Sequence, residues 1–161
     1  MDIKNQNNSA DNELLQLVSF KLGNEEFGIE IAKVQEINRI TSLTQLPNSP
    51  SYIEGIVNLR GKLVPIVNLR KKFGMTQKDA SDKSRIIVVN VADKTLGFIV
   101  DEVTEVLRIP IKITEAPPEV LNGSKTDFIT AVGKLNNKLI ILLDVEKITS
   151  TNEVNNYSSA A

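Results

Sequence analysis

Hydrophobic and polar residues alternate along much of the chain, and this alternation predicts a protein built mainly from β-strands. Residues 18–22 place Val, Phe and Leu at every second position, with Ser and Lys between them. Residues 27–31 repeat the pattern after Gly23-Asn24, so we expect a β-hairpin. In residues 32–40 apolar positions recur at a spacing of three. This segment fits a helix or a turn followed by a strand, and its β-branched side chains favour the second.

The stretch of residues 52–74 gives the clearest hairpin signal. Two apolar runs, residues 56–59 and 63–67, flank the short polar break Arg60-Gly61-Lys62. Because glycine adopts positive φ without strain, the break predicts a tight turn that presents an arginine to solvent. Residues 68–74 then suit a short helical turn, with basic residues in its last turn and a glycine at its end.

The second half of the chain predicts a similar series of elements. Strands are expected at residues 85–91, 96–100, 128–132 and 138–143, and residues 101–109 resemble residues 32–40. Prolines and an Asn-Gly pair indicate a long irregular connection over residues 110–127. Asn136-Asn137 supplies the turn of the last hairpin, and Asp144 is placed to cap a short helix that ends near Ile148.

The two halves resemble each other, which indicates an internal duplication. Residues 18–40 align with residues 87–109 at a constant offset of 69 positions, and residues 52–69 align with residues 128–145 at an offset of 76. A core of about 60 residues is marginal by itself. We therefore predict two small barrels that are packed on each other or threaded into each other. Arg60 falls on Asn136 in this alignment, so the halves share the hairpin but not the arginine.

Composition narrows the possible functions of this 161-residue chain. It contains no cysteine and no histidine, which excludes disulfides, thiolate and imidazole metal ligands, and an imidazole base. No phosphate-binding glycine motif is present. The net charge of −1 and the aromatic content of 4% argue against nucleic-acid binding. We expect no catalytic residues, no cofactor and no metal.

The chain divides into three parts by composition. Residues 1–13 are polar and rich in asparagine, and we expect a disordered lead-in; residues 150–161 are a polar tail. Residues 14–149 are expected to form one domain of two barrel subdomains, at about 14–80 and 85–149, either side by side or intertwined. The N-terminus has no apolar core of a signal peptide, and no apolar run is long enough to span a membrane. We expect a cytoplasmic protein without direct membrane insertion.

Seven segments, in order along residues 15–148, carry a resemblance to a known family. They are Phe27-Gly28-Ile29, residues 34–37, Leu46-Pro47-Asn48, residues 52–61, residues 64–70, residues 97–103 and Ala116-Pro117-Pro118. Together they resemble the CheW family, the coupling proteins of bacterial chemotaxis. The most specific element is Asn-Leu-Arg-Gly at residues 58–61, with Pro65 four residues after its glycine.

The resemblance implies a fold and a function. The expected fold is mostly β, with two packed SH3-like barrels of five strands each and short helices that include one near the C-terminus. The expected function is that of a non-catalytic adaptor. It would couple the cytoplasmic tips of chemoreceptors to the regulatory domain of the histidine kinase CheA beneath membrane receptor arrays. It would pass on the receptor state and be a monomer when alone.

The resemblance also implies which residues bind. Receptor- and kinase-binding residues by the family pattern are Val34, Glu36, Arg60, Gly61, Val103 and Val106. By residue type alone, a turn arginine is more often simply solvated, and the three valines are more often in a core. Arginine has a planar fork suited to a carboxylate, and Glu36 is a candidate partner for Arg60 within the chain.

Other residues have plainer interpretations. Gly28, Gly55 and Gly97 are expected to permit a bulge or close strand packing. Glu105 corresponds to Glu36 in the second half but faces no arginine, so we expect it to be solvated. The run of three cations at residues 70–72 is expected to be a solvated face.

Two further functions remain open from the sequence. One is a CheW-like scaffold of a parallel chemosensory pathway that governs pili or development instead of flagella. The other, less favoured, is a small barrel that binds nucleic acid or a small molecule. Salt-dependent retention on DNA would favour the second, and gene neighbourhood would separate the first from a flagellar role.

Overall fold

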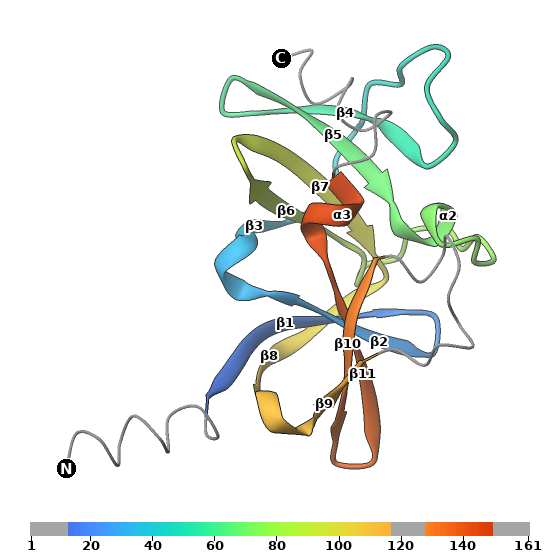
Figure 1. Cartoon of the computed structure of the whole chain (residues 1–161). Coiled ribbons are helices and arrows are strands. Elements are labelled where there is room, and N and C mark those ends of the chain that lie inside the picture. The colour runs from blue at the N-terminus through green and yellow to red at the C-terminus, as the bar shows by residue number, and fades with distance from the viewer. Residues whose placement is uncertain (1–12, 117–127, 150–161) are drawn as a thin grey trace.

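The computed structural model describes residues 13–116 and 128–149 (Figure 1). Its strands are β1 Leu14–Leu22, β2 Glu25–Glu30, β3 Val34–Arg39, β4 Ile53–Leu59, β5 Lys62–Asn68, β6 Arg85–Val91, β7 Lys94–Val100, β8 Glu102–Pro110, β9 Thr114–Glu115, β10 Ile129–Leu135 and β11 Lys138–Leu143. Its helical segments are η1 Ile31–Lys33, α2 Leu69–Lys72, η2 Ile111–Ile113 and α3 Val145–Thr149. The predicted tail, nearly all of the predicted lead-in and most of the irregular connection lie outside the described residues.

The mostly β prediction is confirmed, but the two equal five-stranded barrels are not. The strands form a six-stranded sheet in the order β8-β1-β2-β11-β10-β9 and a five-stranded sheet in the order β3-β6-β7-β5-β4. The sixth strand arises because the chain turns through η2 after β8 and adds the short β9 at the opposite edge. In the described part of the chain, no ladder joins the two edge strands of either sheet, so neither is a closed barrel.

Among the described residues, no ladder closes either sheet. Instead, the two edge strands of each sheet are connected by a continuous segment of the chain. In the six-stranded sheet both edges, β8 and β9, belong to one segment that is interrupted only by η2. In the five-stranded sheet the chain leaves the edge strand β3 and reaches the other edge. There Thr44 and Ile56 of β4 exchange backbone hydrogen bonds of 2.9 and 2.8 Å.

The predicted boundary between residues 80 and 85 does not separate the two sheets. The six-stranded sheet combines β1 and β2 with β8–β11, and the five-stranded sheet combines β3–β5 with β6 and β7. Four ladders join the two halves: β1 with β8 and β3 with β6 are antiparallel, and β2 with β11 and β5 with β7 are parallel. Each hairpin of one half therefore pairs with the hairpin of the other half. Each sheet therefore contains strands from both halves of the chain.

The structure repeats itself at the same two offsets as the sequence. Gly28 lies opposite Leu142 in one parallel pairing, and Gly97 lies opposite Ile66 in the other, which are matching positions of the duplication. The irregularities repeat as well. The β4–β5 ladder shifts register between residues 53 and 55, and the β10–β11 ladder shifts between residues 129 and 131.

Local sequence signals are also confirmed. Residues 32–40 are a short 3-10 turn followed by β3. The side-chain Oδ1 of Asn68 accepts a hydrogen bond from the backbone N–H of Lys71 (3.2 Å) and caps α2. Asp144 caps α3 in the same way through the backbone N–H of Lys147 (3.1 Å).

The main hydrophobic core lies between the two sheets. It joins residues of β1 and β2, such as Phe20 and Ile29, to residues of β6 and β7, such as Ile87 and Phe98, with Ile148 of α3 beside them. Two smaller clusters lie within the individual sheets: one joins residues of β1, β8 and β11, and the other joins residues of β5 and β6. In Figure 1, α3 lies at the middle of the molecule between the two groups of strands. Because the largest cluster is shared, the sheets form one folding unit.

The three predicted structural glycines lie at close approaches. A Cβ on Gly28 would meet Leu17 Cδ1 at 3.1 Å. A Cβ on Gly97 would meet Ile66 Cδ1 at 2.6 Å. Gly55 has a φ of 153°, and a Cβ there would lie 2.5 Å from the backbone oxygen of Thr44. Larger residues at these positions would push the strands apart.

Candidate functional site

Arg60 lies at the tip of the β4–β5 hairpin in a left-handed backbone conformation. Its φ is 55° and that of Gly61 is 83°, as in a type I′ turn, which needs positive φ at both central residues. The backbone N–H of Gly61 donates a hydrogen bond to Oδ1 of Asn58 (2.9 Å). The counterparts Asn136 and Asn137 are also left-handed, with φ of 51° and 66°. Asparagine tolerates this conformation better than arginine, so the needs of the turn do not explain Arg60.

Arg60 forms the ion pair with Glu36 that its chemistry suggested. Nη1 of Arg60 lies 3.0 Å from Oε2 of Glu36, which belongs to the edge strand β3. The other carboxylate oxygen, Oε1, accepts a hydrogen bond from Nδ2 of Asn38 (2.8 Å). Glu36 is 17% exposed whereas Arg60 is 81% exposed. The pair therefore fixes the direction of the guanidinium but leaves most of it open to a partner, and it contributes only about 0–1 kcal/mol to folding.

The three predicted valines do not share one environment. Val34 on β3 and Val103 on β8 are matching positions of the duplication; both are half-buried and pack against the core between the sheets. Val106 on β8 is 56% exposed. The structure brings Arg60, Gly61 and Glu36 together on the five-stranded sheet, and it places Val103 and Val106 on the edge strand of the six-stranded sheet.

The sequence analysis missed other exposed hydrophobic residues near these positions. Ile37 follows Glu36 on β3 and is 40% exposed, and it is the counterpart of Val106. Leu63 lies beside the Arg60 turn, and its counterpart Leu139 lies beside the Asn136 turn; both are exposed. The offsets of 69 and 76 would have found these pairs. In both halves, these matching apolar side chains remain exposed to solvent.

The basic run Arg70-Lys71-Lys72 is not a solvated face, contrary to the prediction. All three side chains are half-buried. Arg70 pairs with Asp101, and Lys71 forms an ion pair of 2.7 Å with Glu54. The ammonium group of Lys72 lies 4.1 Å from the ring centroid of Tyr52. The run therefore holds α2 against neighbouring strands. Glu105, by contrast, is exposed as predicted.

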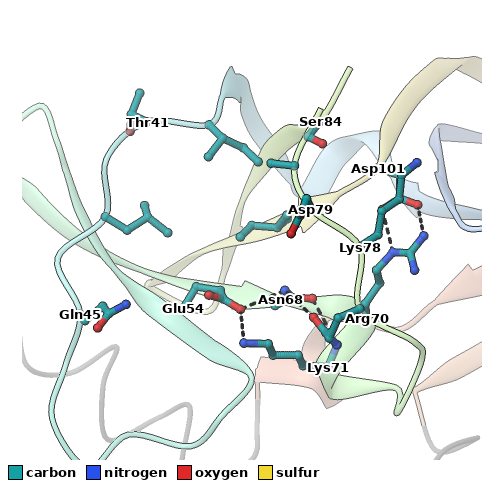
Figure 2. A pocket seen from close by; sticks show the side chains of 15 residues that line it. Thr41, Gln45, Glu54, Asn68, Arg70, Lys71, Lys78, Asp79, Ser84 and Asp101 are labelled. Carbon is teal, nitrogen blue, oxygen red and sulfur yellow. Dashed lines mark hydrogen bonds and ion pairs between the residues drawn. The ribbon is translucent and has the colours of Figure 1, made fainter. Parts of the chain in front are cut away.

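A polar pocket of about 540 Å³ opens beside α2 (Figure 2). In Figure 2, Arg70 and Asp101 face each other at one end, and Glu54 receives Asn68 and Lys71 nearby. These charged groups bind one another. The pocket is thus a place where residues of β4, β5 and α2 and Asp101, between β7 and β8, are fixed together.

The pKa of Asp101 is lowered from its ordinary value of 3.8. The largest cause is the hydrogen bond from Arg70, which outweighs the opposing effect of burial, and the backbone N–H of Gly23 adds to it. The same hydrogen bond raises the pKa of Arg70. Both groups are therefore charged over the physiological range, and each stabilises the charge of the other.

The described residues contain no cluster of three or more acidic side chains that could hold a metal ion. No helix in the described part of the chain is long and apolar enough to cross a membrane.

Comparison with known proteins gives the family. The model of the CheW-like domain matches residues 16–153. The chain belongs to the CheW family. A chemotaxis protein CheW of Klebsiella aerogenes is 37% identical over 139 residues, which cover 86% of this chain and 84% of that protein. A CheW of Treponema pallidum is 33% identical and covers 91% of this chain and 88% of its own.

A solved CheW structure agrees with the fold. The crystal structure of the scaffolding protein TtCheW from Thermoanaerobacter tengcongensis matches with a TM-score of 0.79 and 36% identity. The match covers 86% of this chain and 90% of that protein. The protein is thus a CheW-type coupling and scaffolding protein of chemotaxis signalling and not an enzyme. CheW membership implies the kinase CheA and chemoreceptors as its partners.

Proposed function

We propose that this CheW protein binds a chemoreceptor tip and the regulatory domain of CheA at the same time, and that Arg60 anchors one of these contacts. The observation that carries the proposal is the Arg60–Glu36 pair. It directs an 81% exposed guanidinium outward from a strained turn position where the duplicated half has asparagine. Left-handed strain in a non-glycine residue is retained where something other than folding depends on the side chain.

Apolar positions beside the pair supply the rest of the proposed surface. A helix that docks in a groove needs an apolar stripe flanked by polar anchors. Val106 and Ile37 are exposed, and Val34 and Val103 lie half-buried where the two sheets meet. We assign the receptor tip to the region between these residues, with Gly61 allowing close approach because nothing lies within 4 Å of its missing side chain.

We base the proposed kinase contact on the similarity of the two folds. The regulatory domain of CheA shares the double-barrel fold in this family, so the open edges of the two sheets are suitable for side-by-side association. Single contacts of this kind are weak and gain strength from many copies in an array. We place the protein in the cytoplasm beneath the receptors, as a monomer when it is alone.

Reconstitution of receptor, CheA and this protein tests the coupling function. We expect CheA autophosphorylation to depend on receptor state only when the protein is present. Equal CheA activity with and without this protein would contradict the proposed coupling function. A parallel pathway for pili or development would give the same result with its own receptors, so receptor identity distinguishes the two pathways.

The variant Arg60→Glu tests the anchor. It removes the ion pair and reverses the charge presented to the partner. Since the pair is mostly exposed, the midpoint of thermal unfolding should hardly change, but affinity for a receptor tip should fall by about tenfold or more. Titration of an isolated receptor tip measures the affinity. A matched control is Asn136→Glu, which changes charge at the same turn position of the other half and should leave receptor affinity unchanged.

If a folded Arg60→Glu protein bound the receptor tip with the affinity of the wild type, Arg60 would not be part of the interface. Arg60→Asn adopts the left-handed turn without strain. It should stabilise the turn and still lose receptor affinity, which separates the binding role from the fold.

A further inference from the structure

Arg70 and Asp101 form a partly buried ion pair that makes two contacts and lies away from the Arg60 surface. Nε of Arg70 donates to Oδ1 of Asp101 at 2.9 Å, and Nη2 donates to Oδ2 at 2.5 Å. The third nitrogen, Nη1, donates to the backbone oxygen of Thr76 at 2.5 Å. The two side chains are 12% and 17% exposed. Figure 2 shows the guanidinium and the carboxylate facing each other along both contacts.

The pair connects the two sheets. Arg70 belongs to α2, which directly follows β5 of the five-stranded sheet. Asp101 also reaches the β1–β2 hairpin of the six-stranded sheet. Its Oδ2 accepts the backbone N–H of Gly23 (2.7 Å), and its own N–H donates to the backbone oxygen of Lys21 (3.0 Å). One carboxylate therefore holds an element of each sheet.

Asp101 stands at the point where the chain passes from one sheet to the other. It is the single residue between β7 of the five-stranded sheet and β8 of the six-stranded sheet. Val103 and Val106 follow on β8, and Arg60 lies at the far end of β5 from Arg70. The pair thus sits between the two groups of residues that the proposed function uses.

The other crossing between the sheets also has an ion pair, but at a shifted position. There the chain passes from β2 to β3 through η1, and Lys33 of η1 pairs with Glu146 of α3 at 3.1 Å. Glu146 is the counterpart of Arg70, whereas Lys33 lies one position beyond Ala32, the counterpart of Asp101. These side chains are 34% and 64% exposed, and one nitrogen makes the contact. The two crossings are thus held unequally, one by a partly buried bidentate pair and the other by a more exposed pair with one contact.

We infer that Arg70 and Asp101 are positioning residues of the coupling function. They lock the two sheets together at the β7–β8 crossing, so that a displacement of one sheet by the receptor is transmitted to the other as a rigid movement. They do not touch either partner in this role. The inference rests on the proposed coupling function, and it predicts a loss of transmission without a loss of binding.

The first test uses Asp101→Asn in the reconstituted assembly. Asparagine keeps the shape and an acceptor for Gly23 but removes the charge that holds Arg70. We expect unchanged affinities for the isolated receptor tip and the isolated CheA regulatory domain. We expect receptor-dependent kinase control to fall by about fivefold or more, the usual lower limit of a real coupling. Loss of control with unchanged affinities supports the inference, and full control in the folded variant overturns it.

The second test measures the sheets directly. The chain has no cysteine, so Gln16→Cys on β1 and Asn90→Cys on β6, both exposed, place one spin label on each sheet. We expect one narrow label–label distance in the wild type and a broader distribution with Asp101→Asn or Arg70→Lys. Lysine keeps the charge but not the fork, and it replaces Asp101→Asn if that variant does not fold. An unchanged distribution in both variants overturns the inference.

Matched controls break other ion pairs. Glu115→Gln removes an exposed pair with Lys134 inside the six-stranded sheet, and Lys33→Gln removes the exposed pair at the other crossing. Neither should broaden the distance distribution as Asp101→Asn does; equal broadening by Glu115→Gln overturns the inference. If the wild type fails to control CheA, the proposed function fails while the distance measurement still tests the lock. The two failures are therefore distinguishable.

Discussion

Arg60 and Arg70 lie beyond opposite ends of β5 and show two uses of the same side chain. Arg60 is held by one carboxylate oxygen and remains open, whereas Arg70 uses all three nitrogens inside the protein. An exposed pair is worth about 0–1 kcal/mol. Removing one member of a fully buried pair costs about 3–5 kcal/mol, since it leaves a charge without a partner, so the partly buried Arg70–Asp101 pair should lie between these limits. Substitution of Arg60 should therefore affect binding, and substitution of Arg70 should affect stability as well as coupling.

The lowered pKa of Asp101 makes stability depend on pH in the acid range. Because the folded pKa lies below the unfolded value, the stabilisation is complete above the unfolded pKa. It is lost as pH falls through that value toward the folded pKa. We expect the free energy of unfolding to fall more steeply below about pH 4 in the wild type than in Asp101→Asn. Urea denaturation over a series of pH values measures the difference.

The absence of histidine simplifies this measurement, since no imidazole titrates above the acid range. Glu115→Gln is again the control, because it breaks an exposed ion pair and leaves the Arg70–Asp101 pair intact. If the free energy of unfolding fell equally steeply with decreasing pH in the wild type and Asp101→Asn, Arg70 would not stabilise the carboxylate of Asp101.

At the scale of single elements, the sequence predicted well what is encoded locally. Alternation located the strands, and the turn residues located the hairpins at Arg60-Gly61 and Asn136-Asn137. The cap at Asp144 was visible because capping is a local signal. The role of Arg70 was not visible. A cation on a short helical turn normally meets water, and its partner Asp101 lies 31 positions away.

Glycine at position 97 is an element-scale requirement that can be tested by one methyl group. A Cβ there would lie 2.6 Å from Ile66 and 2.8 Å from Ile86, both buried, at the parallel pairing of β5 with β7. Gly97→Ala should destabilise the fold by about 1–3 kcal/mol through overpacking. Gly133→Ala is the matched control, because its nearest contact would be 3.5 Å. Equal midpoints of urea unfolding for the two variants would contradict this account of the close approach.

At the scale of the whole molecule, the exchange of strands is what the sequence could not decide. The duplication indicated two units, but parallel pairing of β2 with β11 joins residues more than 100 positions apart and leaves no local pattern. The predicted division at residues 80–85 followed chain order for this reason. The exchange places the largest core cluster between the sheets. A scaffold that holds two partners in fixed relation benefits from such a core, because neither sheet can move without repacking it.

The last prediction concerns the two halves as separate chains. A fragment of residues 13–80 would leave β2 without β11, β3 without β6 and β5 without β7, so most of its ladders would be incomplete. We expect neither this fragment nor residues 81–161 to unfold cooperatively on heating when alone, as measured by circular dichroism. An equimolar mixture should recover the transition. As a control, the full chain cut within the exposed loop of residues 76–83 should stay folded, since the cut breaks no ladder. A fragment that folds cooperatively as a monomer would contradict the exchange of strands as the source of stability.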